Sequence, residues 1–342
     1  MFQLISQSIR NERSLLLIFG LSLLVFFVVM DMVLYVTLQS TKLVDQPRTD
    51  DIIFSPFYPL SIKLLMMDPV NHYIITPTTE YFNALTKFSE VFYFITPNMV
   101  SITHLIIGCI SGKLVSSENL KTRRIGCILY EVRFWFDSFD GTLYRARSGK
   151  KEYVSNKSNV GYYVDSVCDT LSGFALSFGI MFYLFKCPPT KSTPSLTWPN
   201  DAEKGTSGEV HIERTNGKYS KRFIFFRTFC YGLLIGISSL GWDRNQDNYS
   251  AVFQKKLDDP KMEALQTSAL HSTTTWLIIW FWRIFQGQAF LHVLVVVIFI
   301  DVVWECFKIV QYAGLLLLIM LLIFSEVHLQ QVRNMLNIPA RR

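Results

Sequence analysis

Two pairs of aspartates are the residues in this chain best suited to chemistry. Asp137 and Asp140 are three residues apart, and Asp165 and Asp169 are four residues apart. Residues at either spacing lie on one face of a helix, so each pair can present two carboxylates to the same side. If the two helices are neighbours, the four carboxylates converge and repel one another unless cations lie between them. Carboxylate oxygens with no histidine or cysteine favour Mg²⁺ or Mn²⁺, and two such ions about 3.5–4 Å apart can orient and neutralise a phosphate.

The residues around the acids suit a substrate that contains phosphate. Gly141 directly follows the second aspartate and Gly161 lies one turn before Asp165, so a bulky substrate can approach the helix backbone at both places. Five cations suited to a diphosphate lie between the two pairs: Arg145, Arg147, Lys150, Lys151 and Lys157. Two alternatives remain open at this point. A basic loop after a membrane helix is also a common topology signal, and aspartates at a membrane edge can line the cation path of a transporter.

The composition indicates a membrane protein. Of the 342 residues 50% are hydrophobic, the mean hydropathy is +0.27 and 18% are charged, whereas soluble domains carry about 25% charged residues. The net charge of +6 is dispersed without a run of basic residues, so nothing indicates a nucleic-acid partner. The six cysteines form no C-x-x-C pair and are interpreted as small apolar residues of the core.

Long apolar stretches predict the helices that position the acids. The first, Ser14–Leu38, is too long for a signal-peptide core and no cleavage motif follows it, so it predicts a transmembrane anchor. A core of six helices is predicted after it, at Asn98–Val115, Ile125–Leu143, Gly161–Phe185, Phe223–Trp242, Thr274–Val297 and Ile298–Leu329. The four aspartates then lie where the second core helix ends and the third begins.

Two further segments complete the expected organisation. The stretch Glu80–Phe94 carries an apolar stripe at helical spacing and predicts an amphipathic helix at the membrane interface. The polar stretch 187–221, rich in Pro, Ser and Thr, predicts a disordered loop. We therefore expect an all-α polytopic membrane protein, with a cytosolic tip and anchor at 1–38, a lumenal or interfacial segment at 39–95 and the core at 96–342.

The order of acids and glycines resembles the signature of the CDP-alcohol phosphotransferases. That signature is D-x-x-D-G-x-x-A-R followed by G-x-x-x-D-x-x-x-D, and Pro97–Ser101 (PNMVS) resembles the motif that opens the family's first core helix. Seven signature positions match: Asp137, Asp140, Gly141, Arg145, Gly161, Asp165 and Asp169. Tyr144 replaces the alanine, and fifteen residues separate Arg145 from Gly161, which is longer than the family pattern. The individual roles of Arg145 and Arg147 stay open, because R-A-R can also be aligned with a shift of two residues.

The resemblance implies a reaction and a role for each aspartate. Members of the family move a phospho-alcohol group from a CDP-linked donor to a hydroxyl acceptor, release CMP and use two divalent cations. By this resemblance Asp137, Asp140 and Asp165 would hold the metals. Asp169 would be both a carboxylate at the metal edge and the general base that takes the proton of the acceptor.

The resemblance also implies a nucleotide site and a wider fold. Gly141, Arg145 and Gly161 would face the CDP group, and Asn98 would reach it from the first core helix. The fold implied is the six-helix CDP-alcohol phosphotransferase core, preceded here by the extra anchor. Dimers are usual in the family, so a homodimer is expected by analogy.

The extra anchor also predicts which side of the membrane the acids face. Arg10 and Arg13 precede the first apolar run and favour a cytosolic N-terminus, and counting spans from there places the aspartates in the lumen. Two glycosylation sequons, at Asn156 and Asn248, fall in segments that this count predicts to be lumenal loops.

An anchored, inverted core with a long spacer resembles the ceramide phosphoethanolamine synthases of the Golgi membrane. This implies transfer of phosphoethanolamine from CDP-ethanolamine to the primary hydroxyl of ceramide, with Mn²⁺ preferred over Mg²⁺. One alternative is an ethanolamine or choline phosphotransferase that acts on diacylglycerol and shares every motif. A divalent-cation transporter is the alternative from another class. Deep charges that could serve it are interpreted instead as interhelical pairs: Glu131, Arg133, Arg227, Arg283, Asp301 and Glu305.

Overall fold

The structure is a computed structural model that describes residues 2–44, 54–149, 153, 160–196 and 212–339. The long helices are α1 (Phe2–Gln39), α5 (Pro97–Val115), α6 (Leu120–Ser148), α7 (Val160–Lys186), α8 (Lys221–Phe253) and α12 (Val303–Met335). The shorter elements are α2 (Ile62–Leu65), the π-helix η1 (Asn71–Ile75), α3 (Thr76–Thr86), α4 (Phe88–Val91), α9 (Pro260–Leu270), α10 (Thr273–Phe285), α11 (Gly287–Phe299), β1 (Thr190–Leu196) and β2 (Ile212–Lys218).

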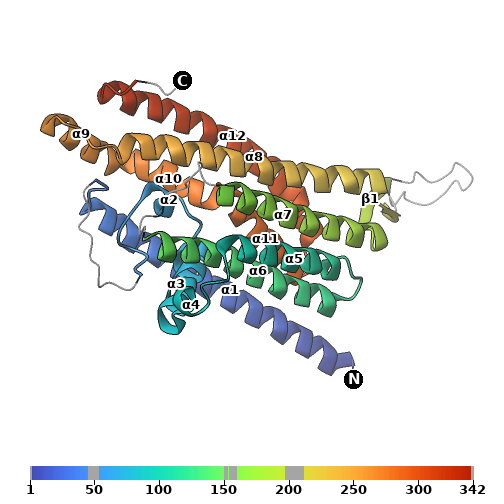
Figure 1. The fold of residues 1–342 in the computed structure, drawn as a ribbon. Helices are drawn as coiled ribbons and strands as arrows, with labels where there is room; N and C mark the ends of the chain where they lie inside the picture. The colour runs from blue at the N-terminus through green and yellow to red at the C-terminus, as the bar shows by residue number, and fades with distance from the viewer. Residues whose placement is uncertain (1, 45–53, 150–152, 154–159, 197–211, 340–342) are drawn as a thin grey trace, which may run out of the picture.

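The long helices run side by side as an elongated bundle, with α1 along its outside (Figure 1). The N-terminus and strand β1 lie at one end of the bundle, whereas α9 and the C-terminus lie at the other. Helix α5 packs most extensively against α6 and α7, and α8 packs against α12, α11 and α7. The chain therefore alternates direction along the bundle, as successive membrane crossings require.

The helices have the length and composition of membrane spans. Among the described residues, five helices are long and apolar enough to cross a membrane, and the bent pair α10–α11 makes a possible sixth. The most apolar 18-residue stretch of α1, within Ser14–Gln39, has a mean hydropathy of 2.7 and is only 6% buried, as expected for a helix that faces lipid. These observations confirm a multi-pass membrane protein that begins with an apolar helix. Helix α6 forms where a core span is predicted, but it is too rich in charged residues to meet the same criterion.

Close packing of α5 against α7 brings the aspartates of α7 next to α5. A methyl group at Gly112 would overlap the backbone carbonyl of Ala175, and one at Gly179 would overlap the carbonyl of Gly112 itself. Small residues at helix crossings let two backbones approach, which favours association inside a bilayer. The crossing holds the polar face of α5 against the acidic face of α7.

Two predicted elements differ from the observed ones outside the long helices. The predicted amphipathic helix over 80–94 is wrong as a single element, because Lys87 adopts a left-handed conformation with φ 49° and separates α3 from α4. The predicted disordered loop is also wrong at its two ends, since β1 and β2 pair as antiparallel strands there. Backbone pairing, which needs no apolar side chains, explains why a polar composition did not reveal the ribbon. The all-α class of the membrane bundle is confirmed, and the two strands form a ribbon outside it. Residues 197–211 lie outside the described residues.

The predicted single span Thr274–Val297 is instead two helices, α10 and α11, bent by 46° at Gln286. The backbone of Gly287 lies against Ser239 of α8, where any side chain would overlap the serine hydroxyl. The last helix begins at Val303, five residues later than its predicted start at Ile298. Continuous apolar composition across this region conceals the break.

Two of the deep charges that were predicted to pair within the bundle, Arg283 and Asp301, form ion pairs. Arg283 of α10 contacts Asp31 of α1 at 2.9 Å, and Arg123 of α6 contacts Asp301 at 2.6 Å. The predicted lumenal loop at the sequon Asn248 is wrong, because Asn248 lies within α8 and accepts a hydrogen bond of 2.9 Å from Arg333. The sequon at Asn156 lies outside the described residues.

Candidate active site

All four signature aspartates surround one histidine ring. His104 of α5 has its Nε2 atom 3.9 Å from Asp137 and 4.0 Å from Asp140, both on α6. The same nitrogen is 3.6 Å from Asp165 and 3.9 Å from Asp169, both on α7. One ligand atom from each of His104, Asp137, Asp165 and Asp169 lies within 4.8 Å of the other three. Helical spacing aligns each pair, and helix packing brings the pairs together.

Positive and polar side chains already offset part of the charge repulsion. Arg133 of α6 forms ion pairs with Asp169 and, at 3.6 Å, with Asp137. Ser101 of α5 donates a hydrogen bond of 2.5 Å to Asp140. A buried arginine that faces several acids is stabilised by them, and it reduces their mutual repulsion in return.

Three atoms that could bind a metal have no hydrogen-bond partner among the described residues. Both ring nitrogens of His104 and the Oδ1 atom of Asp165 are buried without a hydrogen bond. Leaving such atoms unsatisfied costs free energy, which an ion bound among them recovers. Three carboxylates and an imidazole are donors that fit a divalent cation. The described side chains therefore fit the predicted metal centre.

Sequence reasoning missed two residues at this centre. The first is His104, which lies three residues after Ser101 on the same face of α5 and has its Nε2 atom among the four aspartates. Arg133 was interpreted only as a pair within the bundle, yet it contacts two of the aspartates. Its position four residues before Asp137 is the signal that could have identified it, because that spacing places both residues on one helix face.

Comparisons with known proteins identify the family. The family model for ceramide phosphoethanolamine synthase matches residues 49–338 of the chain. A ceramide phosphoethanolamine synthase from Drosophila melanogaster is 32% identical over 286 residues, which is 82% of this chain and 70% of the fly protein. The chain belongs to the ceramide phosphoethanolamine synthase family. The predicted resemblance is confirmed, and this synthase is a membrane-bound transferase of the CDP-alcohol phosphotransferase type.

A solved crystal structure matches more distantly. It is phosphatidylinositol phosphate synthase from Mycobacterium tuberculosis, in complex with manganese and citrate. The match has a TM-score of 0.31 and 16% sequence identity, and it covers 68% of this chain and 89% of the mycobacterial chain.

The predicted nucleotide-facing residues of the synthase lie on the same three helices as the acidic centre. Gly141 is half-buried on α6 next to the Arg145 guanidinium, and Gly161 is half-buried in the first turn of α7. Asn98 is exposed in the first turn of α5, three residues before Ser101. Lys150, Lys151 and Lys157 lie outside the described residues.

The two arginines of the R-A-R sequence have different surroundings. Arg145 forms an ion pair of 2.8 Å with Glu80 of α3 and lies over the ring of Tyr153, 4.0 Å from its centroid. The Tyr153 hydroxyl donates a hydrogen bond of 2.7 Å to the same glutamate, and burial raises the pKa of this phenol. Arg147 instead donates to the backbone carbonyl of Phe92 at 3.1 Å. Arg145 is thus the arginine that side chains hold beside the glycine of the signature.

The segment before the core also contributes groups to this end of the bundle. Lys63 of α2 is half-buried within electrostatic reach of Asp165 and Asp243, and burial lowers the pKa of its amine. Hydrogen bonds hold α2 in place, since Ser61 donates to the carbonyl of Tyr153 at 3.2 Å and Arg283 donates to two carbonyls of α2. Sequence reasoning had no motif that pointed to this lysine.

The break between α10 and α11 brings polar side chains to the acids. Gln288, just after the break, donates a hydrogen bond of 3.1 Å to Asp137 and accepts one of 3.2 Å from Asn71. Gln286 at the break donates to Asp68, which also accepts from Asn71. An amide that donates to a carboxylate fixes its orientation, so Gln288 positions Asp137 from outside the signature.

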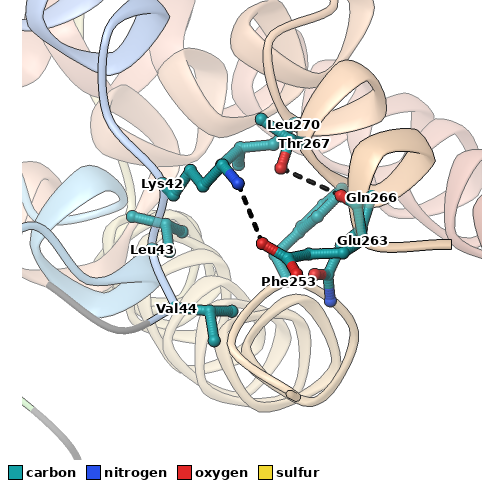
Figure 2. Close-up of a pocket in the computed structure, with 8 residues that line it drawn as sticks. All are labelled: Lys42, Leu43, Val44, Phe253, Glu263, Gln266, Thr267 and Leu270. Atoms are coloured by element: carbon teal, nitrogen blue, oxygen red, sulfur yellow. Dashed lines mark hydrogen bonds and ion pairs between the residues drawn. The ribbon is translucent and has the colours of Figure 1, made fainter. Parts of the chain in front are cut away.

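A separate shallow pocket lies where the end of α1 meets α9 (Figure 2). Eight residues line it: Lys42, Leu43, Val44, Phe253, Glu263, Gln266, Thr267 and Leu270. Lys42 and Glu263 form an ion pair of 2.9 Å across it. None of the signature aspartates lines this pocket, so it is distinct from the acidic centre.

Proposed function

We propose that this synthase transfers phosphoethanolamine from CDP-ethanolamine to the primary hydroxyl of ceramide and releases CMP. The observation that carries the proposal is the convergence of all four signature aspartates on His104, at distances of 3.6–4.0 Å, in a chain of this family. Such a cluster supports a reaction that neutralises phosphate charge with divalent cations. It gives less support to a transporter, since the four acids gather at one place between three helices.

Each aspartate has a role in the proposed mechanism. Asp137, Asp140 and Asp165 would hold two divalent ions, Mn²⁺ or Mg²⁺, which when bound neutralise the diphosphate and lower the pKa of a coordinated hydroxyl. Asp169 would accept the proton of the ceramide hydroxyl at a carboxylate oxygen. The ceramide oxygen forms a bond to the phosphorus that carries ethanolamine, and the bond from that phosphorus to CMP breaks. The electron pair of the broken bond leaves with CMP.

Residues on α5, α6 and α7 near the aspartates in sequence would hold the nucleotide for this step. Gly141 and Gly161 have no side chain, so the CDP group would approach the helix backbone at these two positions, and Asn98 would reach it from α5. Arg145 would contribute charge to the diphosphate, and its contact with Glu80 orients the guanidinium before substrate binds. Holding the donor and acceptor in line for displacement would supply a large part of the rate.

We also propose that the synthase resides in the Golgi membrane as a homodimer, with the acidic centre facing the lumen. The arrangement of the bundle supports opposite locations for the two ends, because β1 lies at the end of the N-terminus (Figure 1). Helix α7 ends just before β1, whereas Asp165 and Asp169 lie in its first three turns, toward the other end. Arg10 and Arg13 favour the cytosol for the N-terminal end. The dimer rests on analogy with the family alone.

The reaction can be tested with purified enzyme and labelled CDP-ethanolamine, offered ceramide and diacylglycerol in parallel with Mn²⁺ present. We expect label in the ceramide product and none when Asp165→Asn replaces the native enzyme. Label in the diacylglycerol product alone would favour the alternative phosphotransferase. Absence of both products, from protein that still binds Mn²⁺, would refute the transferase proposal.

The orientation can be tested with epitope tags in sealed microsomes. A tag inserted between β1 and β2 should be accessible to antibody or protease from outside, whereas a tag at Lys150 should be protected until detergent is added. The two tags control for each other within one protein. The reverse pattern would place the acidic centre in the cytosol.

A further inference from the structure

His104 differs from the other histidines of the described structure. It is fully buried, and neither ring nitrogen has a hydrogen-bond partner. The remaining described histidines each have one: His72 contacts the Pro56 carbonyl, His271 the Thr41 carbonyl, His292 Glu131, and His328 Tyr249. A buried imidazole without a hydrogen-bond partner is rare and costs free energy, so this ring is expected to bind a ligand in the working enzyme.

The surroundings of the ring indicate what it binds. Its Nε2 atom is 3.6 Å from Asp165 and no more than 4.0 Å from each of the other three aspartates. Ligand atoms that share one ion at about 2.1 Å lie roughly 3–4 Å apart, so the spacing matches a common coordination sphere. The Oδ1 atom of Asp165 is buried and unpartnered as well, and it belongs to the same group.

We propose that His104 Nε2 is a direct ligand of a divalent ion held by the aspartates, and that it makes the site select Mn²⁺ over Mg²⁺. This inference rests on the metal-dependent transferase proposed above. Mg²⁺ prefers oxygen ligands and loses its water reluctantly, whereas first-row transition ions gain affinity from an imidazole nitrogen. An oxygen-only centre would discriminate weakly between the two ions, and one nitrogen ligand adds a preference for Mn²⁺.

The helix contacts explain how the nitrogen is held in place. Gly108 lies one turn after His104 on α5, and its Cα approaches Ser172 of α7 so closely that a methyl group would meet the serine hydroxyl oxygen at 2.7 Å. Ser101, one turn before His104, donates a hydrogen bond to Asp140 of α6. The histidine is therefore fixed on both sides by contacts to the two helices that carry the acids.

Pulsed electron paramagnetic resonance on nucleotide-free enzyme loaded with Mn²⁺ can test direct ligation. We expect a nitrogen coupling typical of imidazole, which changes when the protein is made with isotope-labelled histidine. The coupling should be lost in His104→Gln and retained in His328→Gln, a matched change of a buried histidine on α12. Because no substrate is present, an enzyme inactive toward ceramide could still show the coupling, so failure of the transferase proposal is distinguishable.

Metal titration of the same variants tests the selectivity. His104→Gln should weaken Mn²⁺ binding by about tenfold or more while Mg²⁺ binding changes by less than about threefold, because glutamine offers oxygen in place of nitrogen. Equal losses for both ions would overturn the selectivity claim. Absence of histidine coupling in the labelled wild-type protein would overturn the ligand assignment, whether or not the glutamine variant folds.

Discussion

A buried ion pair joins the N-terminal anchor to the core, and its removal gives a sharp test of the packing. Asp31 of α1 accepts hydrogen bonds from Tyr73 at 2.7 Å, from Trp280 at 2.9 Å and from Arg283 at 2.9 Å. Arg283 is fully buried and also donates to the carbonyls of Leu64 and Leu65. The change Asp31→Asn keeps the shape and an acceptor oxygen but removes the negative charge.

The expected loss in the free energy of unfolding follows from the charge that the substitution leaves unpaired. Arg283 keeps its positive charge in a site that water does not reach, and removal of one partner from a buried pair costs about 3–5 kcal/mol. The exposed pair Lys42–Glu263 joins the segment just after α1 to α9, with side chains 60% and 37% exposed. Its variant Lys42→Met should cost no more than about 1 kcal/mol, because water solvates both charges.

Unfolding in mixed detergent micelles, followed by tryptophan fluorescence, can measure both variants. Asp31→Asn should unfold at clearly lower denaturing-detergent fraction than wild type, and Lys42→Met should match wild type. In an Arg283→Met background, Asp31→Asn should cost less than about 1 kcal/mol, because no unpaired buried charge remains. Equal costs in both backgrounds would refute the argument that the ion pair attaches α1 to the core.

Further predictions concern the centre and the helix crossing. Asp137→Asn should abolish turnover without loss of expression, and chelation by EDTA should do the same until Mn²⁺ is returned, so full activity in chelator would contradict the metal mechanism. Asp169→Asn should lower kcat far more than it weakens CDP binding, and proportional losses would indicate a ligand rather than a base. Gln288→Leu should lower activity by about tenfold through loss of its hydrogen bond to Asp137, with little change in thermal stability. Gly179→Val should prevent stable folding because α5 is in contact there, whereas Gly173→Ala, with no atom within 4 Å of the added methyl, should be tolerated.

Local patterns in the chain were sufficient to predict most helices and the pairing of the acids. Apolar runs longer than a bilayer is thick predict spans, because backbone groups in lipid must bond within a helix. The spacing of Asp137 with Asp140, and of Asp165 with Asp169, predicts shared faces from helix geometry alone. Both inferences depend on residues close together in the sequence, so neither needs knowledge of the tertiary structure.

The sequence alone did not determine the contacts between distant segments, because these contacts depend on how the helices pack. The spacing of Arg133 to Asp137 is visible in the sequence, but only the packing of α5 and α7 against α6 brings Arg133 to Asp169 and His104 to all four aspartates. The break at Gln286 is concealed by apolar residues on both sides, yet it is where Gly287 packs against α8 and where Gln288 reaches Asp137. Helical period and hydropathy indicate which face of a helix is apolar. Which other helix packs against that face depends on how side chains from distant parts of the sequence fit together. For this protein, the sequence by itself determined the four carboxylates of the centre. The tertiary structure decided that the imidazole of His104 and the guanidinium of Arg133 lie among them, because these contacts depend on how the helices pack.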